Sequence, residues 1–140
     1  MEIRNYIFHM KHAIIHTDGG ARGNPGPAGT GVVIEFEGHK ILFKEFIGHA
    51  TNNQAEYRAV ILALEKAKDL EVSSIDFFMD SELICNQLKR IYKVKDQELG
   101  VLFIKAWNLM QEFKKVTFRH VMRGDNKEAD RLVNEAIDEK

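Results

Sequence analysis

The order of strand-like and helix-like segments predicts an α/β domain in which helices flank one mixed, five-stranded sheet. Three β-rich segments follow one another near the start of the chain, which is typical of an antiparallel meander. The later strand-like segments are separated by helical patterns, so their connections are crossovers and their strands are expected to run parallel. We therefore expect three antiparallel strands followed by two parallel ones.

The first three strands are indicated by alternation and by turn residues. HAIIHTD, residues 12–18, is short and β-rich, and it ends on Asp18 before a run of glycine and proline. GTGVVIEFEG at 29–38 and KILFKEFIG at 40–48 read as two more strands joined by a Glu-Gly-His turn. Asp18 is thus expected at the end of a strand. There the rigid sheet would fix the position of the carboxylate beside a flexible loop.

The hydrophobic period changes to that of a helix at residues 52–69, with an asparagine at its start as the expected cap. The rest of the chain reads as a strand, two helices, a strand and a final helix, at residues 74–80, 81–92, 97–114, 116–122 and 126–139. No repeat, low-complexity tract or linker interrupts this order. We expect a single domain over residues 12–140, preceded by an N-terminal extension at residues 1–11.

Composition limits the function classes. With 140 residues, 44% of them apolar, the chain can form one core and can be an enzyme. Its single cysteine, Cys85, excludes an internal disulfide and a cysteine metal cluster, which suits a protein in a reducing compartment. We expect the Cys85 side chain to be buried as a small hydrophobic residue. The formal net charge of -1 gives no overall attraction to nucleic acid, so such binding must come from local basic patches. Without a signal-peptide pattern or a bilayer-spanning apolar run, the protein is expected in the cytoplasm, starting at Met1 or Met10.

Four carboxylates fall at corresponding places in these elements. Asp18 and Asp80 end strands, while Glu56 and Asp130 lie in the first turns of helices. Neighbouring strands deliver side chains to a common sheet edge and helix starts lie beside it, so the four acids are expected to meet. Such a cluster suits hard cations such as Mg²⁺ or Mn²⁺ and is typical of two-metal phosphodiester hydrolysis. For any one of these acids taken alone, the alternative to metal binding is ordinary helix capping or a favourable interaction with the helix dipole.

Four ordered motifs carry a family resemblance: TDGGARGNPGPAGTG, TNNQAEYRAVILAL, MDSELI and NKEADRLVNEA. Through them the chain resembles type 1 ribonuclease H over essentially everything after about Lys11. The resemblance implies one catalytic, metal-binding set: Asp18, Glu56, Asp80 and Asp130. It selects Asp130 over Asp125 as the final acid, because that acid ends an Asn-x-x-Ala-Asp pattern. Asp125 is then a helix-start residue.

The resemblance implies hydrolysis of the RNA strand of an RNA/DNA hybrid by two metal ions, Mg²⁺ or Mn²⁺, leaving 5′-phosphate and 3′-hydroxyl ends. It also implies a set of hybrid contacts: Gly19, Gly20, Asn24, Thr51, Asn52, Asn53, Gln54 and Arg123. Turn formation and helix capping are the alternatives for several of them. The hybrid is the only partner implied. We expect a monomer with no membrane or protein partner.

The chain departs from many relatives just before its final acid, where they carry a flexible-loop histidine. Here only RGDN joins the last strand to the last helix. His120 lies earlier, within the strand, where a packed or edge position is expected. Arg123 is better placed to contact the scissile phosphate or the product, with surface solvation as its alternative.

A basic run, LKRIYKVK at 88–95, is expected to end the second helix, in a connection too short for the full basic protrusion of larger relatives. Its cations are Lys89, Arg90, Lys93 and Lys95. They could contact backbone phosphates beside the aromatic rings of Tyr92 and Trp107, or form a solvated helix face.

Two rival functions remain. Another nuclease of the same fold, such as a transposase-like or Holliday-junction enzyme, would share the acids but not the TDGG and TNN motifs. A hybrid-binding module that no longer cleaves is disfavoured by the intact set of four acids.

Overall fold

The computed structural model describes residues 11–140, so the choice between Met1 and Met10 and nearly all of the expected extension lie outside the described residues. The elements in chain order are β1 (His12–Ala21), β2 (Gly26–Phe36), β3 (His39–Ala50), α2 (Asn52–Asp69), β4 (Ser74–Met79), α3 (Glu82–Leu88), α4 (Gln97–Met110), β5 (Lys115–His120), the short 3-10 helix η1 (Arg123–Asp125) and α5 (Lys127–Asp138). Apart from η1, this is the order expected from the sequence.

The strands form one five-stranded sheet in the order β3-β2-β1-β4-β5. β2 runs antiparallel to both β1 and β3, whereas β4 runs parallel to both β1 and β5. The expected mixed sheet is therefore confirmed. β1 lies at its centre and β5 at one edge.

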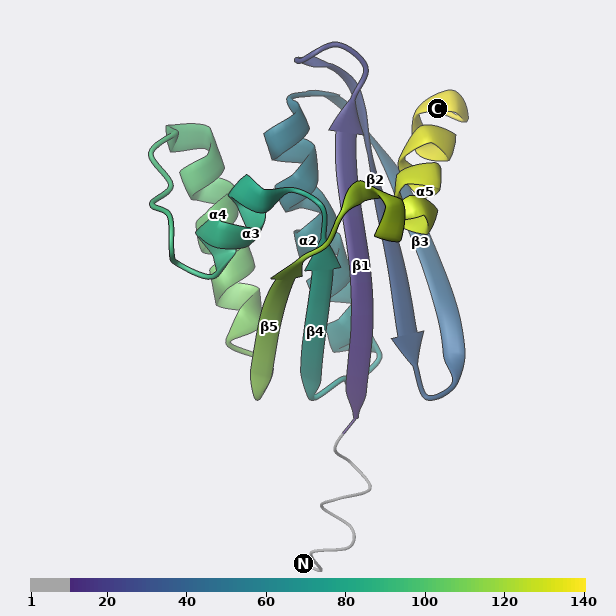
Figure 1. The fold of residues 1–140 in the computed structure, drawn as a ribbon, viewed down its shortest axis with the longest axis vertical. Helices are drawn as coiled ribbons and strands as arrows, with labels where there is room; N and C mark the ends of the chain where they lie inside the picture. The colour runs from purple at the N-terminus through teal and green to yellow at the C-terminus, as the bar shows by residue number, and fades with distance from the viewer. Residues whose placement is uncertain (1–10) are drawn as a thin grey trace, which may run out of the picture.

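Helices cover the two faces of the sheet unequally (Figure 1). α2 packs on β1 and β2, with α4 packed on α2, while α5 packs on β2 and β3 on the other face. The main core lies under α2 and contains the fully buried side chains of Ile15, Leu64 and Phe77. Cys85 is buried in this core, as expected. Within the described part of the chain, no helix combines the length and the apolar character needed to cross a bilayer.

The first strand is longer than the sequence indicated. It continues past Asp18 to Ala21, because Gly20 and Ala21 still pair with Gly29 and Ala28 of β2. Glycine gives a weak local signal for a strand, and here the pairing partner, not local propensity, extends it. The expectation that Asp18 ends its strand is thus wrong, since the residue lies inside the strand.

The second helix is shorter than the expected 81–92. α3 ends at Leu88, and the amides of Ile91 and Tyr92 both donate to the carbonyl oxygen of Asn86, at 2.9 and 3.1 Å. Arg90 adopts a left-handed φ of 64°, which a helix does not accommodate. The basic run therefore follows the helix, and its interpretation as a helix face is wrong.

Candidate active site

Asp18 is positioned by the central strand of the sheet. It pairs with Gly31 of β2 and is only 7% exposed. The amide of Gly19 donates a hydrogen bond of 3.0 Å to Asp18 Oδ1, which orients the carboxylate. Because Asp18 lies within β1 and is paired with β2, this carboxylate has a rigid support.

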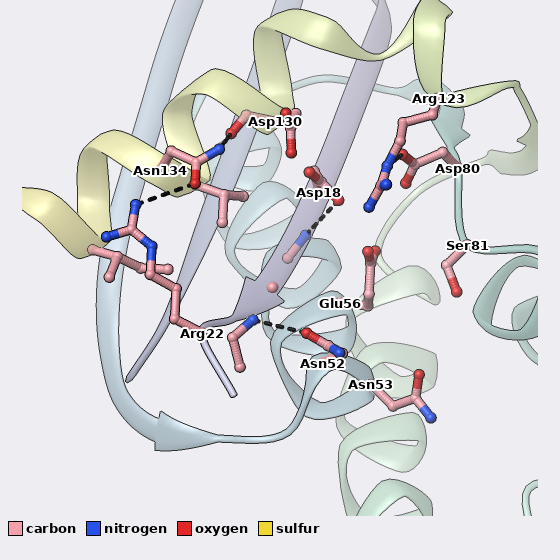
Figure 2. A pocket seen from close by; sticks show the side chains of 15 residues that line it. Asp18, Arg22, Asn52, Asn53, Glu56, Asp80, Ser81, Arg123, Asp130 and Asn134 are labelled. Carbon is pink, nitrogen blue, oxygen red and sulfur yellow. Dashed lines mark hydrogen bonds and ion pairs between the residues drawn. The ribbon is translucent and has the colours of Figure 1, made fainter. Parts of the chain in front are cut away.

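Three further acids reach the same place from other elements (Figure 2). Glu56 projects from α2, Asp80 directly follows β4, and Asp130 lies in the first turn of α5. Carboxylate oxygens of Asp18, Glu56 and Asp80 lie within 4.8 Å of one another. All four acids line one pocket of about 440 Å³, which we call the acidic pocket. The fold thus brings together the four acids expected from the sequence.

Asp130 comes close to Asp18 because α5 rests directly on the sheet at this point. Gly31, the β2 partner of Asp18, makes room for the helix. A Cβ atom at Gly31 would lie 2.2 Å from the carbonyl oxygen of Ala129, an impossible contact. A side chain there would push the helix, and Asp130 with it, away from the strand.

Asn126 is a positioning residue to which the sequence interpretation gave no role. This N-cap of α5 is 2% exposed, and its Nδ2 donates 2.9 Å to the carbonyl oxygen of Thr17. The bond joins the helix that carries Asp130 to the residue that precedes Asp18. The signal was available, because Asn126 opens the NKEAD motif.

Three polar residues that line the acidic pocket were also missed: Arg22, Ser81 and Asn134. Arg22 donates to Asn134 Oδ1 at 3.2 Å and pairs with Asp138, while Asn134 Nδ2 donates to the carbonyl oxygen of Asp130 at 3.1 Å. Ser81 caps α3. Each has an ordinary structural role, so no sequence pattern marks it, and only proximity in the fold reveals it.

Burial and mutual repulsion raise the pKa values of two acids. Burial is the main cause that raises the pKa of Asp18 to about 7, with the negative charges of Asp80 and Asp130 adding to it. Burial, followed by the charge of Asp18, raises the pKa of Glu56 well above its ordinary value. Glu56 Oε2 is buried and has no hydrogen-bond partner among residues 11–140. A divalent cation would satisfy this oxygen and offset the repulsion, so this all-oxygen donor set fits a hard metal ion.

We expect the metal-free protein to be more stable in mildly acidic than in alkaline solution. Carboxyl groups of the unfolded chain titrate near a pKa of about 4. Asp18 titrates near 7 and Glu56 above its ordinary value in the folded protein, so over this window the folded state binds more protons than the unfolded state. The free energy of unfolding therefore falls as the pH rises from about 4 through about 7.

Melting curves in chelator at about pH 5.5 and about pH 8 measure this effect, and the higher melting temperature is expected at the lower pH. The Asp18→Asn variant is the control, because it removes one of the two shifted groups and should narrow the difference. An equally large difference in this variant would assign the pH dependence to other groups.

The residues expected to contact a hybrid divide into two groups. Five of them line the acidic pocket: Gly19, Gly20, Asn52, Asn53 and Arg123. Arg123 lies in η1 with its side chain 88% exposed, and its Nε is 3.9 Å from Asp80 Oδ2. It is therefore close to the acids and open to solvent.

The second group, Asn24, Thr51 and Gln54, makes structural hydrogen bonds and does not line that pocket. Thr51 Oγ1 accepts from the Gln54 amide at 3.1 Å, and Gln54 Oε1 accepts from the Thr51 amide at 2.9 Å, which forms a capping box. The N-cap of α2 is thus Thr51, not an asparagine as expected. Asn24 Oδ1 accepts from the Asn52 amide at 2.9 Å. Substrate contact by these residues stays a prediction.

Two residues that the sequence interpretation set aside lie away from the acidic pocket. His120 is exposed at the end of the edge strand β5, so the expected edge position is confirmed and the packed alternative is wrong. Asp125 lies in η1 and, unlike Asp130, does not line the pocket. In the basic run, Lys89 and Arg90 line a different groove, and phosphate contact by the run stays a prediction.

Several known proteins are similar to this chain in sequence. A family model described as "Reverse transcriptase-like" matches residues 16–136. Ribonuclease HI of Halobacterium salinarum is 41% identical over 124 residues, which is 87% of this chain and 62% of that protein. Bifunctional protein Rv2228c of Mycobacterium tuberculosis is 41% identical over 128 residues, which is 89% of this chain and 35% of that protein. The chain thus spans less than two thirds of the length of either relative.

Two solved structures are similar to this chain in both sequence and fold. The crystal structure of RNase H1 from Halobacterium salinarum matches with a TM-score of 0.88 and 39% identity, covering 92% of this chain and 99% of that chain. LC11-RNase H1, solved in complex with an RNA/DNA hybrid, matches with a TM-score of 0.86 and 46% identity, covering 91% and 97%. Matches of this extent, over the segments that build the acidic pocket, place the chain in the ribonuclease H family.

Proposed function

We propose that this chain is an endonuclease that hydrolyses the RNA strand of RNA/DNA hybrids and leaves 5′-phosphate and 3′-hydroxyl ends. The observation that carries the proposal is the meeting of four carboxylates from four elements in one pocket. The 46% identity with LC11-RNase H1, a protein solved with an RNA/DNA hybrid, supports this substrate class.

The four acids would hold two Mg²⁺ ions, or Mn²⁺ in their place. Bound at this site, such ions supply Lewis-acid chemistry, which activates water and stabilises the departing 3′ oxygen. Asp18 interacts electrostatically with Glu56, Asp80 and Asp130, so it would be the central ligand of the set. Because β1 fixes Asp18, the site needs little reorganisation during the reaction.

Residues beside the acids would read the 2′-hydroxyl, which both donates and accepts a hydrogen bond and distinguishes RNA from DNA. Asn52, Asn53 and Gly20 line the pocket next to the acids. Asn52 Oδ1 already accepts from the Ala21 amide at 2.8 Å, so Asn52 would contact a ribose as a donor, through Nδ2.

A gel assay tests the proposed function. The purified chain is incubated with an end-labelled RNA/DNA hybrid in Mg²⁺, in Mn²⁺ or in excess chelator, with DNA/DNA and RNA/RNA duplexes in parallel. We expect internal cuts in the RNA of the hybrid, only with metal, and products that carry 5′-phosphate. Equal cutting of DNA/DNA duplex, or full activity in chelator, would overturn the proposal. Tight hybrid binding without cleavage would indicate a binding module.

Arg123→Ala is expected to slow turnover or raise KM, whereas His120→Ala is expected to leave the chemical step nearly unchanged. Arg123 lies beside Asp80 and lines the acidic pocket, whereas the exposed His120 does not line it. Charge-assisted contacts from arginine to phosphate are the strong ones. Single-turnover and multiple-turnover kinetics of both variants measure the difference. The opposite ranking would mean that His120 acts on the substrate.

We further propose that residues 12–140 work as one domain, as a monomer, in the cytoplasm. The sheet and the acidic pocket use elements from β1 through α5, and the single cysteine is buried. Light scattering coupled to gel filtration measures the oligomeric state, and a dimer mass would contradict the monomer.

A further inference from the structure

We propose that a groove beside the edge strand β5 binds an extended acidic segment of a partner protein, anchored by one large apolar side chain. The groove has a volume of about 540 Å³ and shares no residue with the acidic pocket. It is formed by the end of α3, the C-terminal part of α4 with the turn that follows, and the first residues of β5, elements that neighbour one another in Figure 1. The proposal therefore does not depend on the proposed nuclease activity.

Apolar side chains form much of the lining: Leu88, Met110, Phe113, Val116 and Phe118. Trp107, the only tryptophan of the chain, also lines the groove. This lining differs from that of the acidic pocket, where polar and charged side chains predominate. An apolar side chain that enters the groove would remove hydrocarbon surface from water on both partners.

The charged residues of the groove are all basic: Lys89, Arg90, Lys114 and Lys115. No carboxylate among residues 11–140 lines it, in a chain whose formal net charge is -1. The nearby acid Glu112 pairs with Lys68 of α2 instead. Lys89, Arg90 and Lys115 around an apolar lining complement acidic side chains that flank an apolar one.

Arg90 is placed over the groove by its backbone and by an aromatic contact. Its φ of 64° turns the chain sharply after α3, and its guanidinium lies 5.1 Å from the centre of the Trp107 ring. A cation over an indole face is a favourable interaction. This contact holds the Arg90 guanidinium at the groove before any partner binds, which lowers the side-chain entropy lost on binding.

The edge strand favours a peptide over a nucleic acid. β5 is the last strand of the sheet and pairs with β4 on its inner side. An extended peptide can add to an exposed strand edge through backbone hydrogen bonds while alternate side chains enter the adjacent groove. A nucleic acid backbone lacks the amide groups for this pairing and would use the cations alone.

Trp107 fluorescence reports on the groove directly, since no other tryptophan is present. The probe is a blocked peptide of six residues, as long as β5, made of Asp and Glu with one central Phe. We expect a saturable change in Trp107 emission that weakens as salt rises. Control titrations use the same peptide with Asn and Gln in place of the acids, the same peptide with Ala in place of Phe, and a single-stranded oligonucleotide. Both altered peptides should bind at least about tenfold more weakly.

Charge reversal tests the contribution of the basic residues that line the groove. The double variant Lys89→Glu, Arg90→Glu is expected to lose at least about tenfold in peptide affinity. Lys93→Glu, in the same basic run but outside the groove lining, is the matched control and should bind like the unchanged chain. Amide chemical shifts at residues 115–118 should move on binding. If the oligonucleotide binds and the acidic peptide does not, the groove takes nucleic acid. If neither changes Trp107 emission, or if Lys93→Glu weakens binding as much as the double variant, the proposal is wrong.

Discussion

Replacing Asp80 with asparagine is expected to abolish cleavage without destabilising the metal-free protein. Asp80 lies within 4.8 Å of Asp18 and Glu56, and its charge raises the pKa of both. Its ion pair with Arg123 is weak, since Nε and Oδ2 are 3.9 Å apart and the arginine side chain is 88% exposed. Asparagine keeps the shape of the side chain and removes the repulsion.

The expected loss of cleavage activity and the expected change in stability of the Asp80→Asn variant can be given approximate magnitudes. Removing a residue that hydrogen-bonds to a metal ligand lowers metal affinity or activity by about 10- to 100-fold. Removing a ligand itself should therefore lower activity by more than about 100-fold. Most substitutions destabilise by about 1 kcal/mol, so an unchanged or higher melting temperature in chelator is informative. A gain of about 1 kcal/mol corresponds to about 3 °C in a domain of this size.

Melting curves with chelator and with Mg²⁺, for the unchanged chain and the Asp80→Asn variant, measure the second effect. A metal that binds only the folded form adds about 2.7 kcal/mol at a concentration 100-fold above its Kd, so the unchanged chain should gain more than the variant. Asp125→Asn is the matched control, since Asp125 does not line the acidic pocket. A variant that melts clearly lower than the unchanged chain in chelator would make Asp80 a structural residue.

The convergence of the acids could be predicted because topology alone requires it. β1 and β4 are parallel neighbours, so Asp18 and Asp80 lie at the same end of the sheet, and Glu56 follows the helix start beside it. The choice of Asp130 over Asp125 depended on the family motif, since the position of Asp130 relies on the contact of α5 with Gly31, which no local pattern specifies. The sequence therefore predicts which residues meet better than it predicts how they are held.

What the sequence could not predict depends on contacts between distant residues. β1 reaches Ala21 because β2 pairs with it, and α3 stops at Leu88 because Arg90 takes a left-handed conformation over Trp107. Local propensity carries no information on either contact, since strong helix formers such as lysine and arginine fill the end of the expected helix. Asn126 is marked in the sequence because it opens the NKEAD motif, but its hydrogen bond to the carbonyl oxygen of Thr17 is again a contact between distant residues.

Gly19→Ala is expected to damage both stability and cleavage, because α2 packs against the backbone of β1 at this residue. A Cβ atom at Gly19 would lie 2.2 Å from the carbonyl carbon and oxygen of Ala55 and 2.5 Å from the amide nitrogen of Glu56. Backbone atoms cannot rotate away, so the start of α2 must shift. Overpacking of this kind costs about 1–3 kcal/mol. The shift moves Glu56 relative to Asp18, and a displacement of about 1 Å at a reacting centre can cost about 100-fold in rate.

Gly20→Ala is the matched control for the role of Gly19, since the two glycines are neighbours in β1 and both line the acidic pocket. A Cβ atom at Gly20 would meet its nearest neighbour, Val133 Cγ1, at 3.6 Å, an ordinary contact. Alanine is tolerated there, and it can add about 0.4–1 kcal/mol by restricting the unfolded chain. Melting temperatures in chelator and single-turnover rates of both variants therefore separate helix packing from substrate contact. If packing against α2 is the reason for glycine, only Gly19→Ala melts lower. If both variants keep their melting temperature and both lose cleavage, the two glycines serve close approach of the hybrid, as the family resemblance implies.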